Sequence, residues 1–320
     1  MGEPGAWPHV SSSFGAIDLA GFAKPPAWWY RSVWLSNVSA ADPGRPPISA
    51  AAAATTVRIV ESWAPPRGGG TTRLIHVYSS APAVQLFLNG AAVSPLLPVP
   101  TWRAAVEANV TYADGTLEAR ALAADGATVL ATHATSSWGA PAALALTVDA
   151  PSAATGTGTR VYLDGADVAL LRATVLDAQG RVVRDSTLNV TFAVTAGPGF
   201  VAGVGNGDPA CQEPSHAPWR SAYHGLARVI VRASINAAGS AAARALEAQV
   251  NVEAGMGVGA RSSSVFQGDA AGAPTSFTVS ASAPGLPPAS VTVQLSVDPA
   301  DSVMAVAAAS VALADLGLAD

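Results

Sequence analysis

Hydrophobic and polar residues alternate in short runs along much of the chain from about Thr56 onward. Three such runs, 57–60, 74–78 and 84–88, follow one another, and the last of them ends at Asn89-Gly90. Alternation with a period of two is typical of strands that bury one face. Asn-Gly after an apolar run indicates a tight hairpin turn, because both residues tolerate positive φ. The pattern therefore predicts antiparallel strands joined by short turns.

Two Asp-Gly pairs, Asp114-Gly115 and Asp125-Gly126, continue this pattern at a spacing of roughly ten residues. They separate further strand-like runs on either side. The block from residue 35 to residue 138 has about the length of one β-sandwich, and we predict that it forms one.

A second block, residues 139–253, repeats the same arrangement. Its strand-like runs include 143–148, 168–176 and 226–233, and a long loop lies at 197–224. We predict a second β-sandwich here. Helix content should be low, because no stretch of about 12 residues outside the N-terminus and the tail has a strong 3.6-residue period.

The last segment, residues 254–320, is rich in Ala, Gly and Ser. It holds two strand-like runs, 276–281 and 290–297. Two strands are too few to close a sheet independently. The segment is therefore expected to be a partial β-module or to be poorly ordered.

Composition narrows the class of function. Charged residues make up 12% of the chain, against about 25% in typical domains. The net charge of -5 offers no basic surface for nucleic acid, and the single cysteine, Cys211, excludes an internal disulfide framework. Neither a signal peptide nor an apolar run of about 18 residues is visible. No membrane partner is expected, and the cellular location stays open.

The opening residues carry the most specific motif. They contain Gly2-Glu3-Pro4, Trp7-Pro8, "SSFGAIDLAGFAK" at 12–24 and an aromatic run at 28–34. This order is similar to the end of the catalytic barrel in glycoside hydrolase family 2, in its β-galactosidase branch. Two further segments resemble later parts of these enzymes: "VYSSAPAVQLFLNG" at 77–90 resembles the intervening sandwich, and "GVGNGDPACQEP" at 203–214 resembles the C-terminal sandwich.

The resemblance implies an all-β chain with two tandem immunoglobulin-like β-sandwiches, preceded by a remnant of a (β/α)₈ barrel. Residues 1–34 would be the last loop and helix of that barrel, and 139–253 would be the family's C-terminal domain. The catalytic barrel domain, upstream or on another chain, would be the partner. Its absence would leave the following apolar side chains without their partners: Phe14, Ile17, Leu19, Phe22, Trp28, Trp29 and Trp34.

The catalytic groups themselves are not found in the sequence. Retaining glycosidases use two carboxylates about 5–5.5 Å apart, one as nucleophile and one as acid/base. The family's acid/base is a Glu that follows Asn, and no Asn-Glu dipeptide occurs here. Glu61 and Glu107 lie in predicted strands, and local spacing places no second carboxylate beside either. No catalytic residue is assigned, and we expect the chain alone to be inactive.

By resemblance, four residues would lie near the sugar pocket: Glu3, Trp7, Phe14 and Asp18. Glu3 falls in the loop after the last barrel strand, where barrel sites are built. The rings of Trp7 and Phe14 could stack on a pyranose. Each residue also has a structural interpretation: a surface position for Glu3, loop packing for the two rings, and for Asp18 an Asx turn that holds the loop.

The loop 206–225 also concentrates side chains that can bind metals. It contains Asp208, Cys211, Glu213, His216 and His224. Their spacing fits no structural zinc pattern, and the glycine-rich strings of the chain do not match a phosphate-binding loop. Neither a metal nor a cofactor is expected.

The favoured function is the C-terminal accessory part of a β-galactosidase-like glycoside hydrolase, whose substrate is a carbohydrate. One alternative is a non-catalytic carbohydrate-binding or adhesive β-sandwich protein, with Trp63, Trp102 or Trp138 as sugar platforms. Another is a split enzyme, in which a second chain supplies the barrel and docks on residues 14–34.

Overall fold

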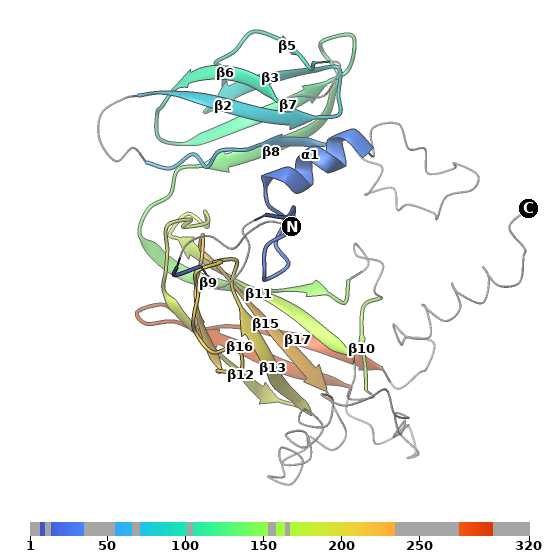
Figure 1. Ribbon diagram of the computed structural model, residues 1–320, viewed down its shortest axis with the longest axis vertical. Coiled ribbons are helices and arrows are strands. Elements are labelled where there is room, and N and C mark those ends of the chain that lie inside the picture. Colours follow the sequence, from blue (N-terminus) through green and yellow to red (C-terminus); the bar gives the residue numbers. More distant parts are fainter. Residues whose placement is uncertain are drawn as a thin grey trace, which may run out of the picture. The chain divides into compact units, whose positions relative to one another are not determined.

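Strands dominate the part of the chain that the structure describes, with α1 (Pro25–Trp34) as its one helix (Figure 1). The computed structural model describes residues 7–9, 14–34, 55–65, 71–100, 105–152, 158–163, 167–233 and 275–296. Unit 1 comprises Met1–Pro141, Asp177–Asp185 and Gly207–Gln212, and unit 2 comprises Ala142–Leu176, Ser186–Asn206 and Glu213–Asp320. The nearly all-β character expected from the sequence is confirmed.

Unit 1 contains eight of the described strands. They are β1 Val57–Ile59, β2 Thr72–Ser79, β3 Ala83–Leu88, β4 Ala91–Ala92, β5 Leu97–Pro98, β6 Val106–Thr111, β7 Thr116–Leu122 and β8 Val129–Ser136. One sheet has the order β1-β2-β6 and the other β4-β3-β7-β8, with β5 also paired to β3. All of these pairs are antiparallel.

Alternate residues of the two sheets point into a shared core. Ile75 and Val77 of β2 are fully buried. Leu117 and Ala119 of β7, in the other sheet, are also fully buried and belong to the same core. Trp63 belongs to the same core, and its indole N–H donates to the Ala113 carbonyl at 2.9 Å. Because every second side chain leaves water, the period-two pattern of the sequence is enough to specify these strands.

The turn between β3 and β4 has the conformation that Asn-Gly predicts. Asn89 has φ 52° and Gly90 φ 83°, both in the left-handed region. The Asn89 side chain also fixes the next predicted turn, because its Oδ1 accepts the Thr116 N–H at 2.9 Å and its Nδ2 donates to the Asp114 carbonyl at 2.8 Å. A Cβ on Gly115 would lie 1.8 Å from Asn89 Oδ1, so that position requires glycine.

Unit 2 is described by itself. Its strands are β9 Pro141–Ala150, β10 Val161–Tyr162, β11 Val168–Asp177, β12 Asn189–Ala196, β13 Gly199–Gly205, β14 Trp219–Ser221, β15 Leu226–Ala233, β16 Ser276–Ser282 and β17 Ala289–Ser296. One sheet has the order β10-β17-β16-β12-β14 and the other β13-β15-β11-β9. Strand β11 buries every second residue along its whole length, as the sequence pattern predicts.

Strands β16 and β17 complete the first of these sheets. β16 pairs with β12, with Phe192 opposite Ala281, and β17 pairs in parallel with β10, with Val161 opposite Leu295. Phe277 of β16 is only 1% exposed. The sequence assigns these runs to a tail, 254–320, separate from the second sandwich. In the structure they join unit 2, because β16 pairs with β12 and β17 pairs with β10, and no local pattern reveals these distant partners.

Helix α1 lies where the family resemblance predicts a helix. Pro25 and Pro26 open it, which fits the fixed φ of proline in a first helical turn. The Arg58 guanidinium of β1 lies over the Trp28 ring, 4.8 Å from its centroid, so the helix packs on the strands of unit 1. Among the described residues, no helix has the length and apolar character that crossing a membrane requires.

Candidate functional site

The loop before α1, residues 14–24, is organised around Asp18. Its Oδ1 accepts the backbone N–H groups of Ala20 and Phe22, each at 2.9 Å, and the Asp18 N–H donates to the Phe22 carbonyl at 2.9 Å. The structural interpretation of Asp18, a turn held by its carboxylate, is confirmed. A contact between Asp18 and a sugar stays a prediction.

A second loop of unit 1, Gly207–Gln212, lies against the first. A Cβ on Gly207 would lie 2.0 Å from Asp18 Oδ2. Gln212 Nε2 donates to the Pro8 carbonyl at 3.4 Å. Two of the motifs that resemble the family, far apart in the sequence, therefore meet in one place.

The other residues predicted near the sugar are only partly covered by the structure. Glu3 lies outside the described residues. Trp7 is 84% exposed and Phe14 is 70% exposed, so neither ring is packed into the loop. Their role as sugar platforms stays a prediction.

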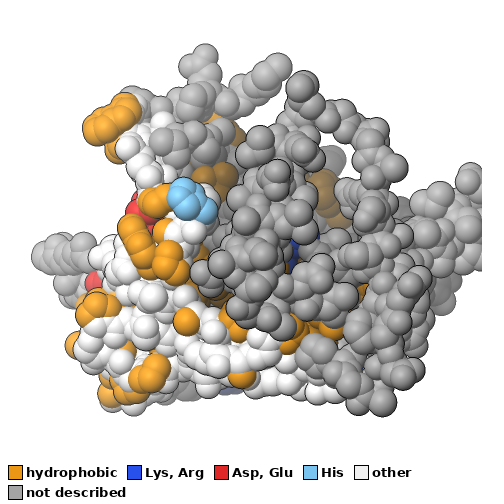
Figure 2. Space-filling view, turned by 90° about the horizontal axis from the view of Figure 1, so that it is seen from below, with side chains coloured by type: hydrophobic (Ala, Val, Ile, Leu, Met, Phe, Trp, Pro, Cys, Tyr) orange, Lys and Arg blue, Asp and Glu red, His pale blue; other side chains and the backbone are white. Residues whose placement is uncertain are grey.

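Exposed apolar side chains are concentrated in this N-terminal segment. Ile17, Leu19 and Trp34 are 59%, 61% and 67% exposed, in addition to the two rings already named. We refer to these five residues as the N-terminal apolar set: Trp7, Phe14, Ile17, Leu19 and Trp34. On the face drawn in Figure 2, the side chains that are coloured by type are mostly hydrophobic, and few are acidic or basic.

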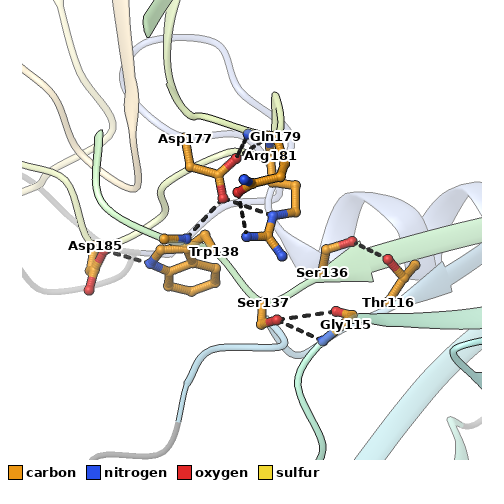
Figure 3. Close-up of polar contacts among 10 residues, drawn as sticks. Gly115, Thr116, Ser136, Ser137, Trp138, Asp177, Gln179, Arg181 and Asp185 are labelled. Atoms are coloured by element: carbon orange, nitrogen blue, oxygen red, sulfur yellow. Dashed lines mark hydrogen bonds and ion pairs between the residues drawn. The ribbon is translucent and has the colours of Figure 1, made fainter. Parts of the chain in front are cut away.

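The structure describes two of the three tryptophans that the carbohydrate-binding alternative requires as sugar platforms. Trp63 is 0% exposed, so this expectation is wrong: its ring fills the core of unit 1. Trp138 is half-buried, and its indole N–H donates to Asp185 Oδ1 at 2.7 Å (Figure 3). Trp102 lies outside the described residues.

Close to Trp138, the buried carboxylate of Asp177 is occupied by hydrogen bonds (Figure 3). Its Oδ1 accepts the N–H groups of Gln179 and Arg181, at 3.0 and 2.9 Å. Its Oδ2 accepts the Gly139 N–H at 2.9 Å and Arg181 Nε at 2.8 Å. Burial raises the pKa of Asp177, but these bonds outweigh it and bring the pKa to about 2. Asp177 therefore has a structural role.

Glu61 and Glu107 share one partner, His76. His76 Nδ1 lies 2.6 Å from Glu61 Oε1, and the His76 backbone N–H donates to Glu61 Oε2 at 2.8 Å. On the other side of the ring, His76 Nε2 lies 3.6 Å from Glu107 Oε1. The imidazole thus separates these two carboxylates. Sequence spacing missed this cluster, because the register of β2 on β6 is what sets His76 opposite Glu107.

In the loop 206–225, which contains several possible metal ligands, two carboxylates accept hydrogen bonds from backbone N–H groups. Asp208 Oδ1 accepts the Ala210 N–H at 2.9 Å, and Glu213 Oε2 accepts the Ser221 N–H at 2.9 Å. Within the described ranges, no three His, Cys, Asp or Glu side chains are grouped as a metal ion would require.

Comparison with known proteins adds an independent observation. The family model of the glycoside hydrolase family 2 C-terminal domain 5 matches residues 154–252, and a domain of unknown function, DUF4982, matches residues 70–130. The beta-galactosidase BoGH2A of Bacteroides ovatus is 29% identical over 242 residues, which is 72% of this chain and 24% of that protein. These matches support the resemblance of the chain to the C-terminal region of a glycoside hydrolase family 2 enzyme.

Solved structures are similar to this family 2 region in fold. A beta-glycosidase from Bacteroides vulgatus matches with a TM-score of 0.63 and 19% identity, over 90% of this chain and 29% of that one. A beta-glucuronidase from glycoside hydrolase family 2 matches with a TM-score of 0.58 and 22% identity, over 90% of this chain and 23% of that one. At these identities the likeness concerns the fold alone. The chain spans about a quarter of the length of the curated relative and of these structures.

Proposed function

We propose that this chain is the accessory C-terminal part of a β-galactosidase-type glycoside hydrolase. In this proposal two immunoglobulin-like sandwiches brace a catalytic barrel, and residues 1–34 are the last loop and helix of that barrel. The observation that carries the proposal is the exposure of the N-terminal apolar set. Three of its members, Phe14, Ile17 and Leu19, lie on the loop that Asp18 holds in shape. The family 2 match over residues 154–252 supports it from the other end of the chain.

Physical reasoning favours a large apolar partner for this surface. Burying one large apolar side chain contributes about 1.5–3 kcal/mol, so covering five exposed ones with a partner would be strongly favourable. A loop already fixed by backbone hydrogen bonds loses little entropy when it binds. The catalytic barrel domain, on the same protein or on a second chain, is the partner we propose.

The proposed reaction is retaining hydrolysis of a terminal β-glycoside, with catalysis in the barrel. Two opposed carboxylates are needed for this chemistry. Among the described residues, Glu61 and Glu107 are divided by His76, and Glu213 is bonded to the Ser221 backbone. A β-galactoside is the proposed substrate because the curated relative is named a beta-galactosidase.

Activity and binding assays test the proposal together. The purified chain, assayed with 4-nitrophenyl β-galactoside and β-glucuronide, should give no turnover. A separately produced family 2 barrel domain from the same organism should bind it, and Leu19→Asp should weaken that binding about tenfold or more. Leu96→Asp, at a leucine 46% exposed outside the apolar set, is the matched control. The proposal would be overturned if the chain alone hydrolysed either substrate, or if Leu19→Asp left the affinity for the barrel domain unchanged.

The carbohydrate-binding alternative has less support. Of its three platforms, Trp63 is inside the core and Trp138 donates its indole N–H to Asp185. Affinity of the chain for galactose-containing oligosaccharides in the absence of any barrel would revive it.

A further inference from the structure

Four residues of unit 1 that carry hydrogen-bond donors lie near one another, although they come from separate segments of the chain. The Arg58 guanidinium lies over the ring of Trp28, 4.8 Å from its centroid. On β8, His133 Nδ1 is 3.2 Å from the backbone nitrogen of Ile59, the residue after Arg58. Arg184 lies near enough to act electrostatically on both Arg58 and His133. The cluster therefore consists of Trp28, Arg58, His133 and Arg184.

Each member of the cluster has an N–H to donate. His133 Nδ1 accepts the Ile59 N–H, so the neutral ring carries its proton on Nε2 and donates from there. The indole nitrogen of Trp28 is buried without an acceptor among the described residues. Buried donors are nearly always paired in folded proteins, so this orphan indicates an acceptor that the described protein does not supply.

The pKa values of the three basic residues in the cluster are all lowered, as expected where positive groups are partly buried close to one another. Burial lowers the pKa of Arg184 and of Arg58, and the charge of Arg184 lowers the pKa of Arg58 further. Burial, then Arg58 and Arg184, lower the pKa of His133 to about 4. A nearby carboxylate would act in the opposite sense, and none in the described part of the chain does so.

Unit 2 shows how this chain balances paired arginines elsewhere. There Asp149 lies between two guanidinium groups, 3.1 Å from Arg172 and 2.8 Å from Arg228. The pair Arg58 and Arg184 has no such carboxylate among the described residues. All three basic side chains of the cluster are only half-buried, so a solute can reach them.

We propose that Trp28, Arg58, His133 and Arg184 bind the oxyanion of a small solute, a carboxylate or a phosphate. Guanidinium groups match both geometrically, through paired N–H···O bonds. A uronic acid and inorganic phosphate are two sources of the same chemistry. This inference does not rest on the proposed function, since none of the four residues belongs to the N-terminal apolar set on which that proposal depends.

Thermal unfolding of the whole chain tests the site. Sodium phosphate and sodium galacturonate are titrated separately at pH 7, against sodium chloride at equal ionic strength. At least one oxyanion should raise Tm in a saturable way. Arg58→Gln and Arg184→Gln should each weaken its apparent Kd about tenfold or more, because a charge-assisted hydrogen bond is lost. Arg160→Gln, at an exposed arginine of unit 2, should change nothing.

The imidazole of His133 gives a second readout that a purely structural role would not move. Followed by NMR, its pKa should rise when the oxyanion binds, because a nearby negative charge favours the imidazolium. Far-UV circular dichroism checks that the variants are folded. A response to phosphate alone or to galacturonate alone identifies the source. If neither anion shifts Tm or the His133 signal, or if both effects persist in the Arg58→Gln/Arg184→Gln double variant, the proposal is wrong.

Discussion

Single aspartates recur as turn anchors in this protein. Asp18, Asp125, Asp177 and Asp208 each accept, through one carboxylate oxygen, the backbone N–H two residues further on. Side chains that compete with the backbone in this way favour turns over helices. In a chain with few charges, these carboxylates are thus used to shape loops. This explains why counting acidic residues along the sequence says little about catalysis here.

The contact between Asp18 and Gly207 can be tested by adding one methyl group. In Gly207→Ala the new Cβ would lie 2.0 Å from Asp18 Oδ2, so the Asp18 side chain or one of the two loops must shift. We expect unfolding in urea to show a loss of about 1–3 kcal/mol.

A double-mutant cycle supplies the control for this change. In an Asp18→Ala background, Gly207→Ala should be much milder, because the clashing oxygen is gone. Gly203→Ala, whose Cβ would find its nearest atom at 3.5 Å, should have a small effect. Equal losses from Gly207→Ala in both backgrounds would contradict the predicted contact.

His133 should make stability depend on pH. Its pKa is about 4 in the folded protein and near 6.5 when unfolded. Between these values the unfolded state binds more protons, so stability falls as pH drops from 6.5 to 4. Since the ring is only half-buried, we expect a loss of roughly 1–2 kcal/mol over this window. Urea unfolding from pH 4 to pH 8 measures it, and His133→Gln should flatten the curve; an unchanged slope in that variant would rule His133 out.

At the scale of elements, the sequence predicts individual strands well and their partners poorly. The turn at Asn89-Gly90 and the buried alternation of β11 follow from local chemistry. The place of β16 does not, because its partner β12 lies far away in the sequence. The same reason hides the Glu61–His76–Glu107 cluster and the electrostatic effect of Arg184 on Arg58. A register or a contact between distant segments decides each of these, and one sequence carries no direct signal for it.

The pairing of β16 with β12 predicts where unit 2 can be shortened. A chain ending at residue 253 lacks β16 and β17, which leaves β10 and one edge of β12 unpaired. We expect it to lose the cooperative unfolding of unit 2 and to aggregate. A chain ending at residue 298 keeps both strands and should unfold like the full chain. Cooperative unfolding of unit 2 in the shorter chain would refute a structural role for the last two strands.

At the scale of the whole molecule, each unit has a core of its own. Unit 1 buries Trp63 among residues of both its sheets, and unit 2 buries Phe192 and Phe277 completely. Separate cores predict separate melting, because a two-state transition follows the cooperative packing of one core.

Calorimetry with one core variant in each unit tests this prediction. Phe277→Ala should destabilise one transition by about 3–5 kcal/mol and leave the other in place. Trp63→Phe should lower only the other transition, so each variant serves as the control for its counterpart. A single transition that both variants shift would mean that the two units melt together.

The covered edge of β3 has a consequence for the behaviour of the protein at high concentration. Two strands of two residues each, β4 and β5, occupy that edge, and β5 ends in Pro98, which has no N–H to donate. Another copy of the chain therefore finds no continuous ladder on which to add a strand. Light scattering of concentrated solutions should detect little self-association at this edge, and Pro98→Val, which restores a donor, should increase it.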